Sequence, residues 1–242
     1  MSEPGSLLRS LFGRSAARNF HSHVINQIGV DVISGRYPVG STLPNDAELM
    51  AEFDVSRTVL REALKTLEAK GLLEARPKVG TKVSRRSRWG LYDPMVLGWH
   101  LEAAPDPDFI NGLFEVRYSL EPQAAAEMAR RRTADQTRLM YYWIRQMETS
   151  LDQLQNFALA DFELHRIIVD AARNPFIRAL SGAIELSHAL AYRSLGEAVD
   201  PEALVKTFEC HRTLASAIEQ GDEVAAREAM NAAIEHDRGR LT

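Results

Sequence analysis

The sequence has few of the features that mark secreted, membrane-spanning or nucleotide-binding proteins. It contains one cysteine, Cys210, which excludes an internal disulfide framework and predicts a buried small apolar residue rather than a reactive thiol. No apolar run approaches the roughly 20 residues that span a bilayer, and Met1 to Gly5 lacks a signal-peptide core. Repeats, low-complexity tracts and glycine-rich phosphate loops are also absent. We therefore expect a cytoplasmic protein with no membrane partner.

Charge is distributed unevenly over an otherwise ordinary globular composition of 45% hydrophobic and 26% charged residues. Residues 1–92 carry 14 basic and 9 acidic side chains, a net charge of +5. Residues 93–242 carry 15 basic and 24 acidic side chains, a net charge of −9. Only the N-terminal part is therefore electrostatically suited to bind a polyanion.

The segment from Thr42 to Val83 has the pattern of a winged helix-turn-helix. Leu43-Pro44-Asn45-Asp46 predicts the start of a short helix over 47–53, and Asp54-Val55-Ser56 interrupts it. Ser56 can cap a second helix, which Gly71 ends. The strand-like runs 72–76 and 81–83 flank Pro77-Lys78-Val79-Gly80, which predicts a basic hairpin.

The residue types on this second helix suit a duplex. A recognition helix enters the major groove with its N-terminal residues against base edges, where arginine binds guanine and the threonine methyl touches thymine. Hairpin lysines suit phosphates or a minor groove, and a glycine permits close backbone approach. The alternative is that these cations form a merely solvated helix face. The predicted DNA-binding residues are Ser56, Arg57, Thr58, Arg61, Lys65, Lys78, Gly80, Thr81 and Lys82.

The pattern predicts a mainly α protein, with the winged helix-turn-helix followed by an all-α antiparallel helical bundle. We expect a mobile basic arm over 1–19, a DNA-binding domain over 20–84 that begins with a helix over 23–34, a linker over 85–104, and the bundle over 105–242. The basic run at 85–88 is either solvated or in contact with phosphate. Bundle helices are predicted over 107–132, 135–153, 156–173, 175–195, 201–220 and 222–240.

One constellation in the bundle could hold a metal ion and a ligand. Asp161 and His165 lie four residues apart and share a helix face, while His211 lies on a later helix. A carboxylate with two imidazoles suits zinc, nickel or manganese. Arg117, near Glu121, could bind a carboxylate effector or form an internal ion pair. An Asp/His pair at this spacing is also typical of surface and capping pairs.

The N-terminal motifs resemble the GntR family of bacterial transcription regulators. Leu43-Pro44, Glu48-Leu49 and the continuous run from Val55 to Leu73 carry this resemblance. It implies that Arg57, Thr58 and Arg61 contact the operator and that Gly80 lies at the wing tip. Ala47 stands where the family often has an arginine, so one operator contact of the family is missing here.

The C-terminal part resembles the FadR-type branch with its FCD effector domain. The motifs that carry the resemblance are Glu115-Val116-Arg117, Glu121-Pro122, Asp161 to His165, Asn174-Pro175, Glu209 to Arg212 and Ala225 to Met230. In that branch one aspartate and three histidines hold a metal under the effector carboxylate. The resemblance implies that Asp161, His165 and His211 are metal and effector ligands, whereas Ala233 replaces the third histidine. We expect His188 and His236 to be ordinary core or surface histidines.

The segment from Trp89 to Trp99 resembles the galactonate-responsive subgroup, which implies a sugar-acid effector such as an aldonate. The resulting hypothesis is a dimeric repressor that binds a palindromic DNA operator and is released when a small carboxylate engages Arg117 and the metal. Two alternatives stay open. One is a metal-dependent hydrolase that carries a DNA-binding domain, and the other is a structural dimerisation bundle without a ligand.

Overall fold

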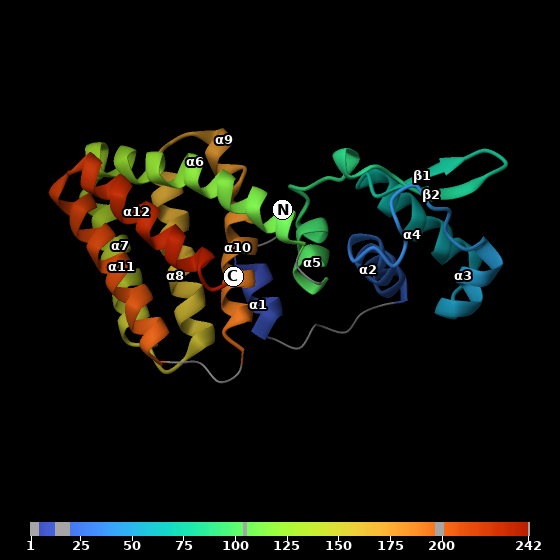
Figure 1. Cartoon of the computed structure of the whole chain (residues 1–242), viewed down its shortest axis with the longest axis horizontal. Coiled ribbons are helices and arrows are strands. Elements are labelled where there is room, and N and C mark those ends of the chain that lie inside the picture. The colour runs from blue at the N-terminus through green and yellow to red at the C-terminus, as the bar shows by residue number, and fades with distance from the viewer. Residues whose placement is uncertain (1–4, 13–19, 104–105, 197–200, 242) are drawn as a thin grey trace. The chain divides into compact units, whose positions relative to one another are not determined.

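The computed structural model describes residues 5–12, 20–103, 106–196 and 201–241 and divides the chain into two units (Figure 1). One unit contains the elements between residues 20 and 103. The other contains the helices from residue 107 onward together with the short helix α1, Ser6–Phe12. A segment that precedes the first unit in the sequence therefore folds with the second unit.

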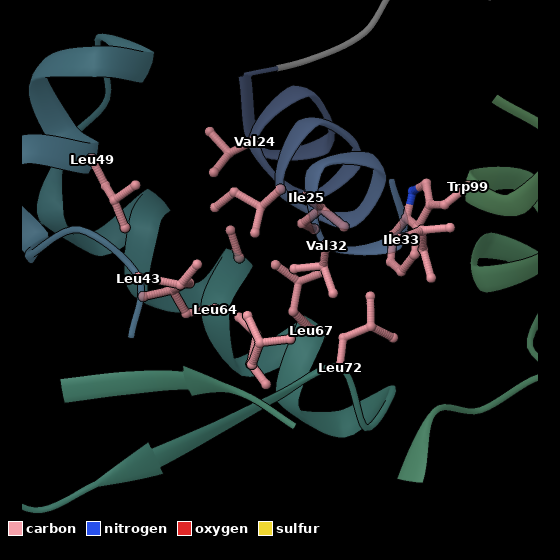
Figure 2. Close-up of a cluster of buried hydrophobic side chains, with 14 of the residues drawn as sticks. Val24, Ile25, Val32, Ile33, Leu43, Leu49, Leu64, Leu67, Leu72 and Trp99 are labelled. Carbon is pink, nitrogen blue, oxygen red and sulfur yellow. The ribbon is translucent and has the colours of Figure 1, made fainter. Parts of the chain in front are cut away.

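The N-terminal unit has the predicted order of helices and a hairpin. Its elements are α2 (Phe20–Ile33), α3 (Asp46–Phe53), α4 (Arg57–Ala69), β1 (Leu73–Arg76), β2 (Gly80–Val83), a 3-10 turn (Arg86–Arg88) and α5 (Pro94–Glu102). The strands pair antiparallel, with Leu73 opposite Val83 and Arg76 opposite Gly80. Apolar side chains from α2, α4 and α5 meet in a common core (Figure 2). This arrangement agrees with the predicted winged helix-turn-helix.

The turn between α3 and α4 forms as the sequence indicated. The Asn45 side chain accepts hydrogen bonds from two backbone amides of α3, and the Glu48 carboxylate accepts one from the Asn45 backbone amide, which makes a complete capping box. Asp54 then adopts a left-handed backbone with φ of 50°, and Ser56 caps α4 through the Val59 amide. These local bonds fix the start of α4, the predicted recognition helix.

Part of the segment predicted as a linker over 85–104 packs into the N-terminal core, to which Trp89, Val96, Trp99 and Ala103 belong. Trp99 on α5 is 1% exposed, and its indole donates to the Asn26 side chain at 3.1 Å. A Cβ atom on Gly29 would lie 2.4 Å from the Trp99 ring, so only glycine permits this approach of α2 to α5. Residues 89–103 therefore complete the DNA-binding unit, and residue 104 lies outside the described residues.

The C-terminal unit consists of helices in the described residues. They are α6 (Pro107–Arg131), α7 (Ala134–Glu148), α8 (Leu154–Ala171), α9 (Pro175–Arg178), α10 (Ser181–Ser194), α11 (Pro201–Gln220) and α12 (Glu223–Arg238). The side chains of Asn174 and Asp222 cap α9 and α12. The helix predicted over 175–195 is instead divided into α9 and α10. No helix among the described residues is long and apolar enough to cross a membrane.

Helix α1 differs from the mobile arm predicted over 1–19. Leu7 and Leu8 are buried, and α1 lies beside α10 in Figure 1. The Glu185 carboxylate on α10 accepts a hydrogen bond from the Leu7 amide at 2.6 Å, which satisfies a donor at the start of α1. Burial raises the pKa of the Glu185 carboxyl, although the hydrogen bonds from the backbone of α1 act in the opposite direction. The sequence analysis did not predict α1, because a helix of seven residues is stable only when it packs against a partner. Residues 1–4 and 13–19 of the predicted arm lie outside the described residues.

We predict that Gly71→Ala destabilises the N-terminal unit far more than Gly40→Ala does. Both glycines have left-handed backbones, with φ of 80° and 83°, and each alanine costs about 1 kcal/mol for that conformation. A Cβ on Gly71 would also lie 1.9 Å from the Arg88 carbonyl oxygen, whereas Gly40 has open space. We expect Gly71→Ala to lower the free energy of unfolding by at least about 2 kcal/mol more than Gly40→Ala does. Urea unfolding checks this, and equal effects of the two variants would contradict it.

Candidate functional site

Helix α4 presents one face to the core and the other to solvent. Leu60, Ala63, Leu64 and Leu67 are buried. The exposed face carries four of the predicted DNA-binding residues, Arg57, Thr58, Arg61 and Lys65. The amphipathic pattern therefore predicted the orientation of this helix correctly, and Arg57 and Arg61 stand on its first two turns with their guanidinium groups accessible.

Several basic side chains of the N-terminal unit are neutralised by carboxylates. Arg36 pairs with Asp31 and Glu52, Lys70 with Asp93, and both Arg76 and Arg88 with Glu74. Lys65 pairs with Glu62 on its own helix at 2.9 Å. The residues without an ion pair in the described part of this unit are Arg57, Arg61, Lys78, Lys82 and Arg85. Free cations are thus concentrated on α4 and the hairpin.

The hairpin ends in a strongly turned tip. Lys78 has a φ of 63° and Gly80 a φ of 106°, and the loop residues 77–80 are exposed. Val79, between them, is 54% exposed. Lys78 is therefore the one non-glycine residue of this tip whose backbone is strained by a left-handed conformation. Lys78 at the tip and Lys82 on β2 are available to an anionic partner outside the chain.

A second cluster of polar groups lies in the core of the C-terminal unit. Asp161 and His165 come from α8, His188 from α10 and His211 from α11, and each is 0% exposed. The Oδ1 atom of Asp161 lies 2.9 Å from His211 Nε2, 3.6 Å from His165 Nε2 and 3.7 Å from His188 Nε2. The Nε2 atoms of His165 and His211 are 2.9 Å apart. Four donor atoms from three helices therefore converge.

The outward nitrogens of the three histidines show which tautomers are present. His188 Nδ1 lies 2.9 Å from the Ile184 carbonyl oxygen, and His211 Nδ1 lies 2.8 Å from the Thr207 carbonyl oxygen. His165 Nδ1 contacts the Glu121 carboxylate. Carbonyl and carboxylate oxygens only accept, so each Nδ1 carries the proton and each neutral ring presents an Nε2 lone pair. Three lone pairs then face Asp161, an arrangement that a cation among them would balance.

The chain's own protons partly supply that positive charge. Burial by itself lowers the pKa of His211, but the adjacent Asp161 carboxylate more than compensates and raises it overall. Burial would raise the pKa of Asp161, yet His211 and His188 hold it well below its ordinary value. For His165, burial dominates and lowers the pKa. A proton on His211 and a metal ion are thus alternative ways to balance the same lone pairs.

A buried chain of charges adjoins this cluster. The Arg117 guanidinium pairs with Glu121 at 2.5 Å and with Asp237 at 2.9 Å, and all three side chains are fully buried. Its Nη2 atom has no hydrogen-bond partner in the part of the chain that the structure describes. Burial by itself would raise the pKa of Glu121, but Arg117 and His165 lower it far below its ordinary value. Asp237 on α12 also pairs with Arg240, which lies just beyond the end of that helix. The Arg240 guanidinium stacks over the Tyr192 ring.

Comparisons with known proteins identify the family. Residues 20–83 match the bacterial regulatory proteins of the gntR family, and residues 112–236 match the FCD domain. The chain is 32% identical over 213 residues to the galactonate operon transcriptional repressor of Escherichia coli (strain K12), and the match covers 87% of this chain and 92% of that protein. This chain belongs to the GntR family. It is therefore a DNA-binding transcription regulator with an FCD domain.

Further relatives agree with this GntR assignment. The repressor NanR of Salmonella newport (strain SL254) is 30% identical over 182 residues, which cover 75% of this chain and 70% of NanR. The solved structure of Streptococcus agalactiae GntR is 27% identical, covers 90% of this chain and 99% of its own, and has a TM-score of 0.50. The Listeria monocytogenes protein Lar shares the fold at 18% identity, with coverage of 94% and 98% and a TM-score of 0.67.

The structure of this GntR regulator brings together the predicted ligands Asp161, His165 and His211, and it places Arg117 in the adjoining charge chain. His188, expected to be an ordinary histidine, also belongs to the cluster, and Asp161, His165 and His188 offer atoms within 4.8 Å of one another. His236 instead contacts the Thr207 hydroxyl at 3.1 Å. The named relatives are transcription regulators, so nothing among them supports the hydrolase alternative.

Sequence reasoning also missed three further residues of the buried cluster. Tyr192 donates to Asp161 at 2.5 Å, while Asp237 and Arg240 extend the charge chain. Asp237 and Arg240 lie just after Ala233, in a part of the sequence assessed only for a histidine. The available signal was an acid three residues before an arginine within the helix predicted over 222–240, because side chains at that spacing can meet.

Proposed function

We propose that this GntR regulator is a dimeric repressor that a small sugar acid, such as an aldonate, releases from a palindromic operator. Two relatives are named repressors, and one of them is the repressor of a galactonate operon. Galactonate is an aldonate, so its chemistry matches a cation-lined site. A two-fold symmetric dimer would place two winged domains on the half-sites of a palindrome.

The proposed DNA contacts rest on the free cations of the N-terminal unit. Arg57 and Arg61 would read base edges from the major groove, with Thr58 beside them, because these side chains are exposed at the start of a helix that is otherwise anchored in the core. Ser56 and Lys65 lie on either side of these three residues along α4. The hairpin residues Lys78, Gly80, Thr81 and Lys82 would approach the backbone or the minor groove. Arg85, also unpaired, would add a phosphate contact.

A divalent ion fits the buried cluster. Asp161, His165 and His211 would hold it, with zinc as the first candidate and nickel or manganese as alternatives. Their facing atoms are 2.9 to 3.6 Å apart, close to the roughly 3 to 3.5 Å between ligands that share an ion at about 2.1 Å. The observation that carries the proposal is the set of Nδ1 donors, because it aims every Nε2 lone pair at the same point.

The same surroundings suit a carboxylate effector. A divalent ion at this point supplies open coordination positions for carboxylate and hydroxyl oxygens. Arg117 offers the unpartnered Nη2 donor in a fully buried setting, where a charge-assisted bond to a carboxylate is strong. Because Asp161, His165 and Arg117 are all buried, an entering ligand must displace packed side chains. Ligand binding therefore favours a second arrangement of the bundle, which is the requirement for coupling to DNA affinity.

A gel shift with the promoter beside the protein's own gene tests the proposed function. Full-length protein, loaded with zinc, should retard this DNA, and millimolar galactonate or gluconate should release it, whereas neutral galactose should not. The Asp161→Asn variant should still bind the DNA but lose the response. If wild-type protein binds the promoter and no aldonate alters that binding, the sugar-acid part of the proposal fails. A thermal shift with the same compounds then distinguishes another ligand from a purely structural bundle.

A further inference from the structure

Helix α12 lacks the histidine that the FCD resemblance leads us to expect, and the space is occupied by a small side chain. Ala233 is 0% exposed, so this position faces the interior of the bundle. Asp237, one turn later on the same face of α12, has its Oδ2 atom 3.8 Å from His188 Nε2. Helix α10, which carries His188, packs against α12. His188 therefore lies on the side of the cluster that α12 covers.

His188 has the local geometry of a metal ligand. Its ring is fully buried, its Nδ1 donates to the Ile184 carbonyl, and its Nε2 has no hydrogen-bond partner among the described residues. An unsatisfied nitrogen at this depth costs free energy unless a ligand completes it. The same Nε2 is 3.7 Å from Asp161 Oδ1, and the centroids of the His188 and His165 rings are 4.6 Å apart. A backbone carbonyl thus orients His188 in the way that another backbone carbonyl orients His211.

We propose that His188 on α10 supplies the imidazole that is missing at Ala233 on α12. The cluster then retains one aspartate and three histidines, but the ion joins α8, α10 and α11 instead of α8, α11 and α12. The alanine is part of the exchange, because a second imidazole at position 233 would compete for the same buried volume. This inference rests on the proposed metal site and goes beyond it by assigning the fourth ligand and its helix.

The competing explanation is that His188 only bridges two carboxylates. Its Nε2 lies between Asp161 Oδ1 and Asp237 Oδ2, at 3.7 and 3.8 Å, so a protonated ring could act as a structural counter-ion. The two roles differ in what the loss of the imidazole changes. A ligand affects metal affinity directly, whereas a counter-ion affects the stability of the bundle and leaves three ligands in place.

Zinc affinity, measured on the full chain by competition with a chromophoric chelator, tests the assignment. His188→Gln should weaken zinc binding by at least about 10- to 100-fold, since the loss of even an outer-shell partner has an effect of that size. The double variant His188→Ala, Ala233→His should recover affinity to within a few-fold of wild type, because it returns the imidazole to α12. His236→Gln is the matched control and should leave zinc affinity unchanged, because its ring contacts Thr207.

The outcomes separate this inference from the proposed metal site. If wild type binds zinc, Asp161→Asn loses it and His188→Gln stays within about twofold of wild type, His188 is a structural counter-ion and the inference is overturned. If wild type binds neither zinc, nickel nor manganese, the proposed metal site itself is wrong and the inference falls with it. Should His188→Gln fail to fold, the double variant decides the question: zinc affinity near that of wild type supports the exchange, and its absence refutes it.

Discussion

Replacing Arg57 and Arg61 together with alanine should lower affinity for the operator by about 30-fold or more without changing the fold. Both guanidinium groups are exposed and have no ion pair among the described residues, so their removal leaves no buried charge behind. A good arginine contact to a base contributes about 1–3 kcal/mol of discrimination, and two such losses amount to about 2–6 kcal/mol. Fluorescence anisotropy with operator DNA measures the change.

The control for this double variant is Arg36→Ala, which removes a cation already neutralised by Asp31 and Glu52. It should change operator affinity by no more than about twofold once the folded fraction is matched by circular dichroism. Competition with non-specific DNA adds a second test. Loss of base reading lowers the affinity for the operator more than the affinity for random DNA, whereas loss of phosphate contacts lowers both alike and reduces the salt dependence. Unchanged operator affinity would remove Arg57 and Arg61 from the recognition surface.

Arg117→Met should destabilise the C-terminal unit by about 3–5 kcal/mol, the usual cost of removing one partner from a buried ion pair. Arg117 lies between Glu121 and Asp237, and none of the three side chains is exposed. Methionine fills much of the volume but leaves these carboxylates without their shared cation. Arg138→Ala is the control, because Arg138 forms an exposed pair with Asp135 within the same unit and should cost no more than about 0.5 kcal/mol. Urea unfolding of the C-terminal transition provides both values.

The pH dependence of Arg117→Met should have a definite sign. In the wild type, Arg117 helps to lower the pKa of Glu121 against the effect of burial, so that stabilisation is present above the unfolded pKa of about 4.3 and is lost as the pH falls. Without the guanidinium, burial keeps the Glu121 carboxyl neutral to higher pH, and its ionisation then destabilises the fold as the pH rises. The destabilisation should therefore be larger at about pH 7.5 than at about pH 5. A loss independent of pH would indicate a cavity effect instead.

Local signals in the sequence account for most of the secondary structure. Asn45 and Ser56 predicted the starts of α3 and α4, and both side chains make the expected capping bonds. The apolar spacing of α4 predicted which face is buried. Capping and periodicity involve residues within about four positions of one another, so a single sequence contains the whole interaction. Two elements also depend on distant contacts: α1 forms against α10, and α5, which Asp93 caps locally, packs through the approach of Trp99 to Gly29.

The buried site was only partly predictable for the same reason. Asp161 and His165 are one helical turn apart, and this spacing identifies a shared face. His188 has no other cluster histidine or aspartate at helical spacing, and every residue from Ala183 to Tyr192 on α10 is buried, so no hydrophobic stripe distinguishes its inward face. The available signal was the combination of Ala233 at an expected histidine position and a spare histidine in a largely apolar helix.

The sequence by itself determined the type of protein. Its capping residues, helical periodicity, uneven charge and long GntR motif establish a winged helix-turn-helix followed by a helical bundle, because each of these features depends on near neighbours or on composition. Only the tertiary structure decided which side chains meet. The convergence of α8, α10 and α11 on Asp161, the burial of Arg117 between two carboxylates and the docking of α1 on Glu185 all join residues distant in the chain. Such contacts arise from helix packing, which leaves no periodic mark in the sequence.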